Sequence, residues 1–202
     1  MSAPAEAAPL RVPPLPREDW TEAARAVFAF WGEPDAYEQG SGSNMVMALA
    51  THPPLAMAYY TFGRHVMMAS TLSARTRELI VLRVAWTARC AYEWHYHVGY
   101  ALNIGLDLAE IAAIGEGWRA AIWDARDAAT LRAVEELQAT SRLSAGAREM
   151  LAPHCDAPQI LDLVFAIGNY VMLSYAIAVA DMRLEDGIDP IGFDLKTAAG
   201  LT

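Results

Sequence analysis

Three reactive side chains recur at helical spacing within one short segment of the chain. Cys90 is followed by Glu93 three residues later and by His97 four residues after that. At about 100° per residue these side chains fall within a strip roughly 60° wide, whereas His95 falls on the opposite side of the helix. The spacing therefore predicts that a thiol, a carboxylate and an imidazole face the same way.

Such a strip can transfer protons or do thiol chemistry. A carboxylate four residues before an imidazole can orient the ring and raise its basicity, which suits acid–base catalysis near neutral pH. A thiol near a helix start, beside an imidazolium, is expected to be partly ionised. The structural alternative is that Glu93 and His97 form an ordinary i,i+4 pair and that Cys90 is a small core residue.

Three further residues are candidate substrate contacts. Trp94 lies about 40° from Cys90 on the helical wheel and is expected to pack in the core with some exposure to a pocket. An anionic substrate needs a local cation on this acidic chain, and Arg83 or Arg89 is nearest in sequence. His52 is a third candidate, although a lone histidine is more often a structural residue. We expect no metal site, because the thiol, carboxylate and imidazole would crowd on one helix without a fourth ligand.

Helices must position these groups, because no stretch alternates apolar and polar residues long enough for a convincing strand. We therefore predict an all-α, multi-helix protein. Residues 1–16 form an extended Pro/Ala-rich arm, 17–186 a single helical domain and 187–202 a loose C-terminal tail. Within the domain the expected helices cover about 17–31, 54–69, 73–86, 90–104, 107–114, 124–139, 144–151 and 158–182, and 44–50 is a short segment before the second of them.

The composition and net charge of the chain restrict the kinds of partner that it can bind. The chain has 202 residues, of which 54% are hydrophobic and only 19% charged, and its net charge is -9. The acidic charge argues against binding to nucleic acid or an anionic membrane, and the low charge fraction suggests a homo-oligomer. Two distant cysteines and the lack of a signal peptide predict a cytoplasmic protein. The uncharged run 163–180 is expected to be a buried or subunit-interface helix rather than a membrane span.

The same residues carry a family resemblance. Arg77-Glu78-Leu79, Cys90, Glu93, His97 and the segment Ala101-Leu102-Asn103-Ile104-Gly105-Leu106 resemble the carboxymuconolactone decarboxylase and AhpD-like superfamily. The resemblance is strongest over residues 73–115 and extends more weakly from 44 to 182. It implies an AhpD-like helical bundle that forms a dimer, trimer or hexamer, and it adds Glu78 to the catalytic candidates.

One position departs from the AhpD branch, whose pattern is a glutamate, eleven residues and then Cys-x-x-Cys-x-x-x-His. Glu93 replaces the second cysteine, and a carboxylate cannot form the disulfide that AhpD-type peroxide reduction needs. Cys155 is the only other thiol that could resolve an oxidised Cys90. The decarboxylase branch instead has Glu-x-x-x-His at these positions, so Glu93 and His97 carry over as its acid–base pair.

Glu78 can join the site only if the chain folds back between it and Cys90. On one straight helix the two residues would lie about 18 Å apart along the axis, and residues 87–89 contain no glycine or proline. The resemblance implies two separate helices, but otherwise Glu78 would pair with a nearby arginine.

We therefore expect a cofactor-independent decarboxylase acting on a small carboxylated or lactone metabolite, with Glu78, Cys90, Glu93 and His97 in its site. Two alternatives stay open: a thiol-dependent peroxidase using Cys90, and a non-catalytic helical binding or assembly protein.

Overall fold

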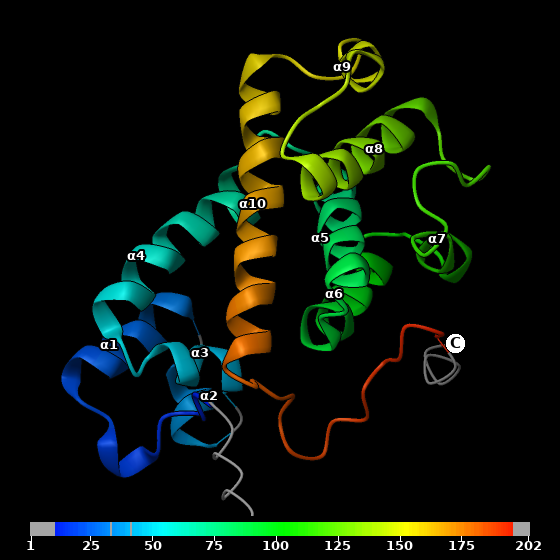
Figure 1. The fold of residues 1–202 in the computed structure, drawn as a ribbon. Coiled ribbons are helices and arrows are strands. Elements are labelled where there is room, and N and C mark those ends of the chain that lie inside the picture. Colours follow the sequence, from blue (N-terminus) through cyan, green and yellow to red (C-terminus); the bar gives the residue numbers. More distant parts are fainter. Residues whose placement is uncertain (1–10, 33, 41, 196–202) are drawn as a thin grey trace, which may run out of the picture. The chain divides into compact units, whose positions relative to one another are not determined.

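The computed structural model describes residues 11–32, 34–40 and 42–195, and these residues contain helices but no β-strand (Figure 1). The prediction of an all-α fold is confirmed. The α-helices are α1 (Glu22–Trp31), α2 (Pro34–Glu38), α3 (Asn44–Leu49), α4 (Pro53–Arg64), α5 (Ala74–Ala88), α6 (Ala91–Asn103), α7 (Leu108–Ala113), α8 (Ala125–Thr140), α9 (Ala145–Leu151) and α10 (Ala157–Val179). A short π-helical segment, His65–Ala69, follows α4.

The chain divides into two compact units, with the divisions falling inside α4 and α10. Unit 1 comprises Met1–Tyr60 and Tyr175–Asp186, and unit 2 comprises Thr61–Ser174 and Gly187–Thr202. The four catalytic candidates all lie in unit 2, so the fold of this unit decides the site.

Unit 1 is built around α1. A 3₁₀ turn, Arg17–Asp19, forms at the predicted start, and α1 begins after Thr21, whose hydroxyl accepts the backbone N–H of Ala24 and caps the helix. Phe28 then stacks on Tyr37 with ring centroids 4.5 Å apart. In the described part of the predicted arm, the Val12 N–H donates to the Ala180 carbonyl, so residues 11–16 are tied to their own unit.

Helix α5 is the centre of unit 2 and is buried on most sides, as the apolar stretch 79–86, interrupted only by Arg83, predicts. One of its faces packs with α8 and α10 through Ile80, Val81 and Val84. The opposite face packs with α6 and α7 through Leu79, Leu82 and Ala85. Packing on both faces therefore holds α5 in place, together with the side chains that it presents to α6.

Helices α5 and α6 are separate, and the break lies at Arg89. This residue adopts the left-handed conformation (φ 54°, ψ 35°), and the next N–H, that of Cys90, donates to the Ala85 carbonyl at 2.9 Å. An L-residue pays a steric cost there. The Arg89 guanidinium lies over the rings of Trp86 and Phe193, which offsets part of that cost. The turn therefore needs no glycine, and for this reason no local sequence signal announces it.

The segment 187–195, predicted to be a loose tail, packs on unit 2. The Trp94 indole N–H donates to the Gly192 carbonyl at 3.1 Å, and the Phe193 ring lies 5.1 Å from that of Trp94. The segment lacks helical periodicity, so its order comes from tertiary contacts that a search for helices cannot detect.

By length and composition, α10 could cross a membrane, but 44% of its most apolar 18-residue window is buried inside the protein. Its buried positions include Asn169 and Ser174, two polar residues. These features agree with a core helix of a folded protein.

Candidate functional site

The turn at Arg89 brings α5 and α6 together, and this places Glu78 beside His97. The Nδ1 atom of His97 lies 2.7 Å from Oε2 of Glu78, and only 8% of the surface of His97 and 2% of that of Glu78 are exposed. Because a carboxylate accepts hydrogen bonds, this contact fixes the ring and leaves Nε2 as the nitrogen available to a ligand. The helix break implied by the family resemblance is therefore present.

Glu93 has a different role from the predicted one. It was expected to orient His97, but Glu78 makes that contact. Glu93 instead accepts a hydrogen bond from the Ser174 hydroxyl of α10. The Cys90 thiol also donates to Glu93. Among the described residues, no hydrogen-bond donor reaches the second carboxyl oxygen of Glu93, Oε1, which is buried.

Burial sets the protonation of this carboxyl group. Loss of hydration raises the pKa of Glu93 to about 7, although the hydrogen bonds from Ser174 and Cys90 and the proximity of His97 act in the opposite direction. Glu93 is therefore present in both its protonated and its ionised form at neutral pH, as a group that gives and takes protons must be.

The thiol of Cys90 is not partly ionised, contrary to the expectation from its place at a helix start. Burial, followed by the negative charge of Glu93, raises the pKa of Cys90 to about 12. At neutral pH, Cys90 is therefore a hydrogen-bond donor to Glu93, and it becomes a nucleophile only if a base removes its proton.

Alkylation at pH 8 is expected to test this assignment. With a pKa near 12 the thiolate population of Cys90 should be on the order of a thousandfold below that of an ordinary cysteine, so iodoacetamide should leave it unmodified in the native protein. Peptide mass spectrometry of native and urea-unfolded samples measures this, with unfolding restoring full labelling. Labelling of native Cys90 as fast as in the unfolded chain would contradict it.

Cys155 is too distant to resolve an oxidised Cys90 within one chain. It precedes α10, whereas Ser174, which contacts Glu93 beside Cys90, lies 17 residues after the first residue of that helix. At about 1.5 Å per residue the separation along α10 is roughly 26 Å, and a disulfide requires Cα atoms within about 7 Å. The intramolecular version of AhpD-type chemistry is therefore excluded.

Three residues of the site were missed as functional candidates. Ser174 stands in an uncharged apolar run, and a lone hydroxyl there is the signal that could have revealed it. Arg77 contacts the cluster, with its Nε atom 3.3 Å from Oε1 of Glu78. The ring of Tyr170 stands edge-on to His97 at 5.4 Å, a contact between α10 and α6 that local sequence cannot reveal.

The predicted substrate contacts lie elsewhere. Trp94 is fully buried and packs against Phe193, so it supports α6 from the core without the predicted exposure to a pocket. Arg83 pairs with Glu135 at 3.1 Å and donates to the Ile114 carbonyl at 2.6 Å. His52 belongs to unit 1, is exposed and accepts the N–H of Leu55 at 3.5 Å. The side-chain hydrogen bonds and ion pair of Trp94 and Arg83 therefore join residues outside the cluster.

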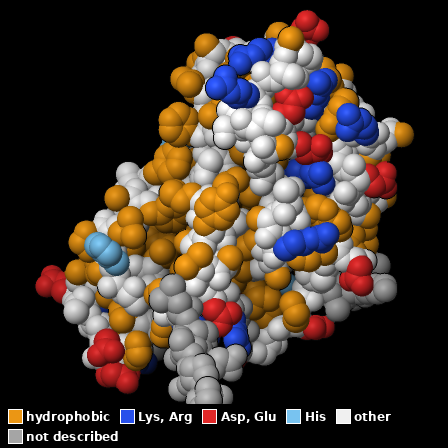
Figure 2. Space-filling model, viewed as in Figure 1, with side chains coloured by type: hydrophobic (Ala, Val, Ile, Leu, Met, Phe, Trp, Pro, Cys, Tyr) orange, Lys and Arg blue, Asp and Glu red, His pale blue; other side chains and the backbone are white. Residues whose placement is uncertain are grey.

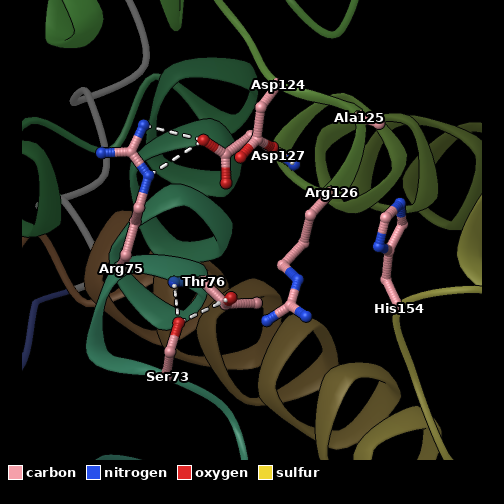
Figure 3. Close-up of a pocket in the computed structure, with 8 residues that line it drawn as sticks. All are labelled: Ser73, Arg75, Thr76, Asp124, Ala125, Arg126, Asp127 and His154. Atoms are coloured by element: carbon pink, nitrogen blue, oxygen red, sulfur yellow. Dashed lines mark hydrogen bonds and ion pairs between the residues drawn. The ribbon is translucent and has the colours of Figure 1, made fainter.

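A separate polar pocket of about 570 Å³ lies between the first turns of α5 and α8 (Figure 3). Arg75 and Asp127 form an ion pair in its wall at 2.7 Å, and the side chains of Arg126 and His154 also line it. None of the four catalytic candidates lines this pocket. Among the described residues, no group of three or more His, Cys, Asp or Glu side chains is placed to hold a metal ion.

Comparison with known proteins agrees with the fold. Residues 53–136 match the carboxymuconolactone decarboxylase family, a segment that contains all four catalytic candidates. Among curated proteins, none matches this chain.

Solved structures share the fold at low sequence identity. A peroxidase-related protein with an alkylhydroperoxidase AhpD core, from Ralstonia eutropha JMP134, is 18% identical (TM-score 0.72), with 94% of this chain and 97% of that chain covered. A peroxidase-related protein from Silicibacter sp. TM1040 is 22% identical (TM-score 0.70), with coverages of 92% and 96%. A debrominase is 19% identical (TM-score 0.68), with coverages of 87% and 92%.

The segment matched by the family model contains α5, the turn at Arg89 and α6. Over residues 53–136 the chain is similar to the carboxymuconolactone decarboxylase family, and it has the fold of AhpD-like proteins.

Proposed function

We propose that this protein is a cytoplasmic enzyme that decarboxylates a small carboxylated or lactone metabolite by acid–base chemistry, without a cofactor. The observation that carries the proposal is Glu93: a buried carboxyl group with a pKa of about 7, one oxygen without a partner, and the Glu78–His97 pair beside it. A buried ionisable group with an unpaired oxygen costs stability, so it is usually retained for use.

The reaction needs only an electron sink in the substrate and a proton from the protein. When the substrate's C–C bond to its carboxylate breaks, carbon dioxide leaves and the electron pair moves into the conjugated lactone carbonyl, which forms an enolate. Protonated Glu93 then gives its proton from Oε1 to carbon, and solvent reprotonates it. With Nδ1–H donated to Glu78, the Nε2 atom of His97 is an acceptor, and in this proposal it takes up the solvent proton that is returned to Glu93.

An anionic substrate also needs a cation at the site, and Arg77 supplies it in this proposal. Its side chain is about one-fifth exposed and reaches Glu78 through Nε. The two terminal nitrogens of a guanidinium form a fork that matches a carboxylate. Arg77 thus replaces Arg83 and Arg89 as the residue that binds the substrate carboxylate.

Incubation of the purified protein with carboxymuconolactone tests the narrow form of the proposal. We expect release of carbon dioxide with one proton taken up per turnover, measured by gas detection and by the absorbance change of the lactone. The control is the Glu149→Gln variant, which changes an exposed carboxylate and should retain full activity. No turnover of this lactone or of related carboxylated lactones would refute decarboxylation.

A second candidate function is thiol chemistry at Cys90, and the hydrogen bond between Cys90 and Glu93 favours it. Glu93 is the base that could take the thiol proton and make Cys90 a nucleophile. The AhpD-like neighbours are described as peroxidase-related, and a variant of the debrominase with a cysteine replaced by alanine has been solved with 2,3,4-tribromopyrrole. Treatment with peroxide distinguishes this function, because it requires sulfenic acid at Cys90 and turnover with an added thiol reductant.

A third possibility, a non-catalytic binding or assembly role, predicts that Glu93→Gln and His97→Ala change no activity while they alter oligomer stability.

A further inference from the structure

The polar pocket between the first turns of α5 and α8 takes no part in the proposed decarboxylation (Figure 3). Three segments of unit 2 line it: the start of α5, the start of α8, and His154, which lies between α9 and α10. Its volume of about 570 Å³ falls within the range of small-molecule sites, roughly 300–1,000 Å³. The pocket is therefore large enough for a ligand, and the side chains in its wall that lack a partner decide which kind.

Both carboxylates of the wall already have partners. Asp127 is 2% exposed and pairs with Arg75 at 2.7 Å, and Arg75 also pairs with Glu110 at 2.5 Å. The carboxylate of Asp124 accepts the N–H of Asp127 at 2.8 Å and caps α8. Arg75 and the positive end of the α8 dipole thus balance these negative charges, which do not determine the charge of a ligand.

Arg126, by contrast, is a cation without a partner. In the part of the chain that the structure describes, no hydrogen bond or ion pair involves its guanidinium, which extends from α8 toward Thr76 in Figure 3. It is the second residue of α8, where the positive end of the helix dipole disfavours another positive charge. A cation kept at this position in the wall of a cavity is suited to bind an anion.

The imidazole of His154 lies close to this cation. The ring is half-buried and, among the described residues, has no hydrogen-bond partner. Burial raises the pKa of the adjacent Cys155, and the charge of Arg126 acts against this rise, so the guanidinium is near the loop that carries His154. Arg126 and His154 can therefore contact the same ligand.

The hydroxyl groups of Ser73 and Thr76 add one more donor. Their oxygens lie 2.9 Å apart and share one hydrogen bond, in which either can be the donor. The Ser73 oxygen also accepts the N–H of Thr76 at 3.0 Å, which caps α5. Because one proton is enough for the shared bond, the other hydroxyl proton can be donated to a ligand.

We propose that this pocket binds the phosphate group of a small molecule through Arg126, His154 and the hydroxyl pair of Ser73 and Thr76. Donors reach the cavity from three separate segments, which suits the several oxygens of a tetrahedral phosphate, whereas a carboxylate offers only two oxygens in one plane. The net charge of -9 does not prevent this binding, because distant charges are screened and Figure 2 shows several basic side chains over α8 and α9. None of these residues belongs to the catalytic cluster, so the site does not depend on the proposed decarboxylation.

Isothermal titration calorimetry of the full chain with inorganic phosphate, glycerol 3-phosphate and succinate tests the proposal. We expect both phosphates to bind with a Kd below about 1 mM and succinate to bind at least roughly tenfold more weakly. Arg126→Gln should weaken glycerol 3-phosphate binding by roughly tenfold to a hundredfold, because it removes a charge-assisted hydrogen-bonding group. Arg142→Gln is the matched control: it removes the charge of an exposed arginine that does not line the pocket, and binding should be unchanged.

Two further measurements separate binding from folding. Arg126→Gln should unfold at the same or a higher urea concentration than the wild type, because it removes an unpaired cation from the start of α8. In NMR spectra, glycerol 3-phosphate should shift the ring signals of His154 but not those of His52, an exposed histidine of unit 1.

Three results would overturn the proposal. The first is a wild type that binds neither phosphate at about 10 mM, and the second is binding that Arg126→Gln retains in full or that leaves the His154 signals unchanged. The third is succinate binding tighter than that of both phosphates, which would reassign the pocket to a carboxylate.

Discussion

Replacing Glu93 with glutamine is expected to lower turnover by roughly a hundredfold to ten-thousandfold, the usual contribution of a general acid or base. Glutamine keeps the size of the side chain and can accept the Ser174 hydrogen bond, but it cannot release a proton. The measurement is steady-state turnover of the carboxylated lactone by the variant and the wild type.

The pH profile distinguishes proton donation from a structural role. Because the pKa of Glu93 is raised to about 7, the protonated acid is lost as pH increases above 7, and wild-type activity should fall about tenfold per pH unit there. The residual activity of Glu93→Gln should not show this fall.

Although it is less active, the Glu93→Gln variant should be at least as stable as the wild type at alkaline pH. A carboxyl group with a raised pKa binds its proton more tightly in the folded state, so above pH 7 its ionised form destabilises the protein. At pH 8, Glu93→Gln removes that buried charge and should unfold at the same or a higher urea concentration than the wild type. An active variant, or one that has lost activity only because it is unfolded, would contradict the assignment.

Replacing Glu78 with alanine is expected to reduce both activity and stability. The variant leaves the Nδ1 atom of buried His97 without its partner, which costs about 1–3 kcal/mol of unfolding free energy. It also frees the ring to rotate and change tautomer, so turnover should fall by roughly a hundredfold or more. Urea denaturation and steady-state kinetics measure the two effects.

Glu78→Gln is the matched variant, because its amide oxygen still accepts the Nδ1 proton while the charge is removed. It should recover most of the stability and part of the activity. Nitrogen NMR of the His97 ring supplies a readout of position: the tautomer protonated at Nδ1 should dominate in the wild type and in Glu78→Gln but not in Glu78→Ala. Equal tautomer populations in all three proteins would show that Glu78 does not position the ring.

Much of the site could be predicted from local spacing together with the family resemblance. Cys90, Glu93 and His97 share a strip because helix geometry is regular, and that prediction needs only their separations. The separate roles of Cys90, Glu93 and His97 could not be predicted, because they depend on contacts with α10. Ser174 holds Glu93 from a position 81 residues away in the chain, and burial, rather than the helix start, sets the protonation of Cys90.

The same limit applies to the fold. Helices with clear caps, such as those after Ser73 and Asp107, were predicted close to their observed starts, because a capping side chain acts within one turn. The turn at Arg89 is stabilised by contacts with Trp86 and Phe193, and the second of these residues is about 100 positions further along the chain. Sequence patterns of short range cannot report such contacts.

The turn at Arg89 also has a consequence for the order in which the protein folds. Glu78 and His97 are only 19 residues apart, and a helical hairpin of this length closes rapidly because little chain entropy is lost. The histidine pair can therefore assemble while the rest of the chain is still leaving the ribosome. Glu93 acquires its Ser174 hydrogen bond only after α10 docks, so the site becomes complete late in synthesis.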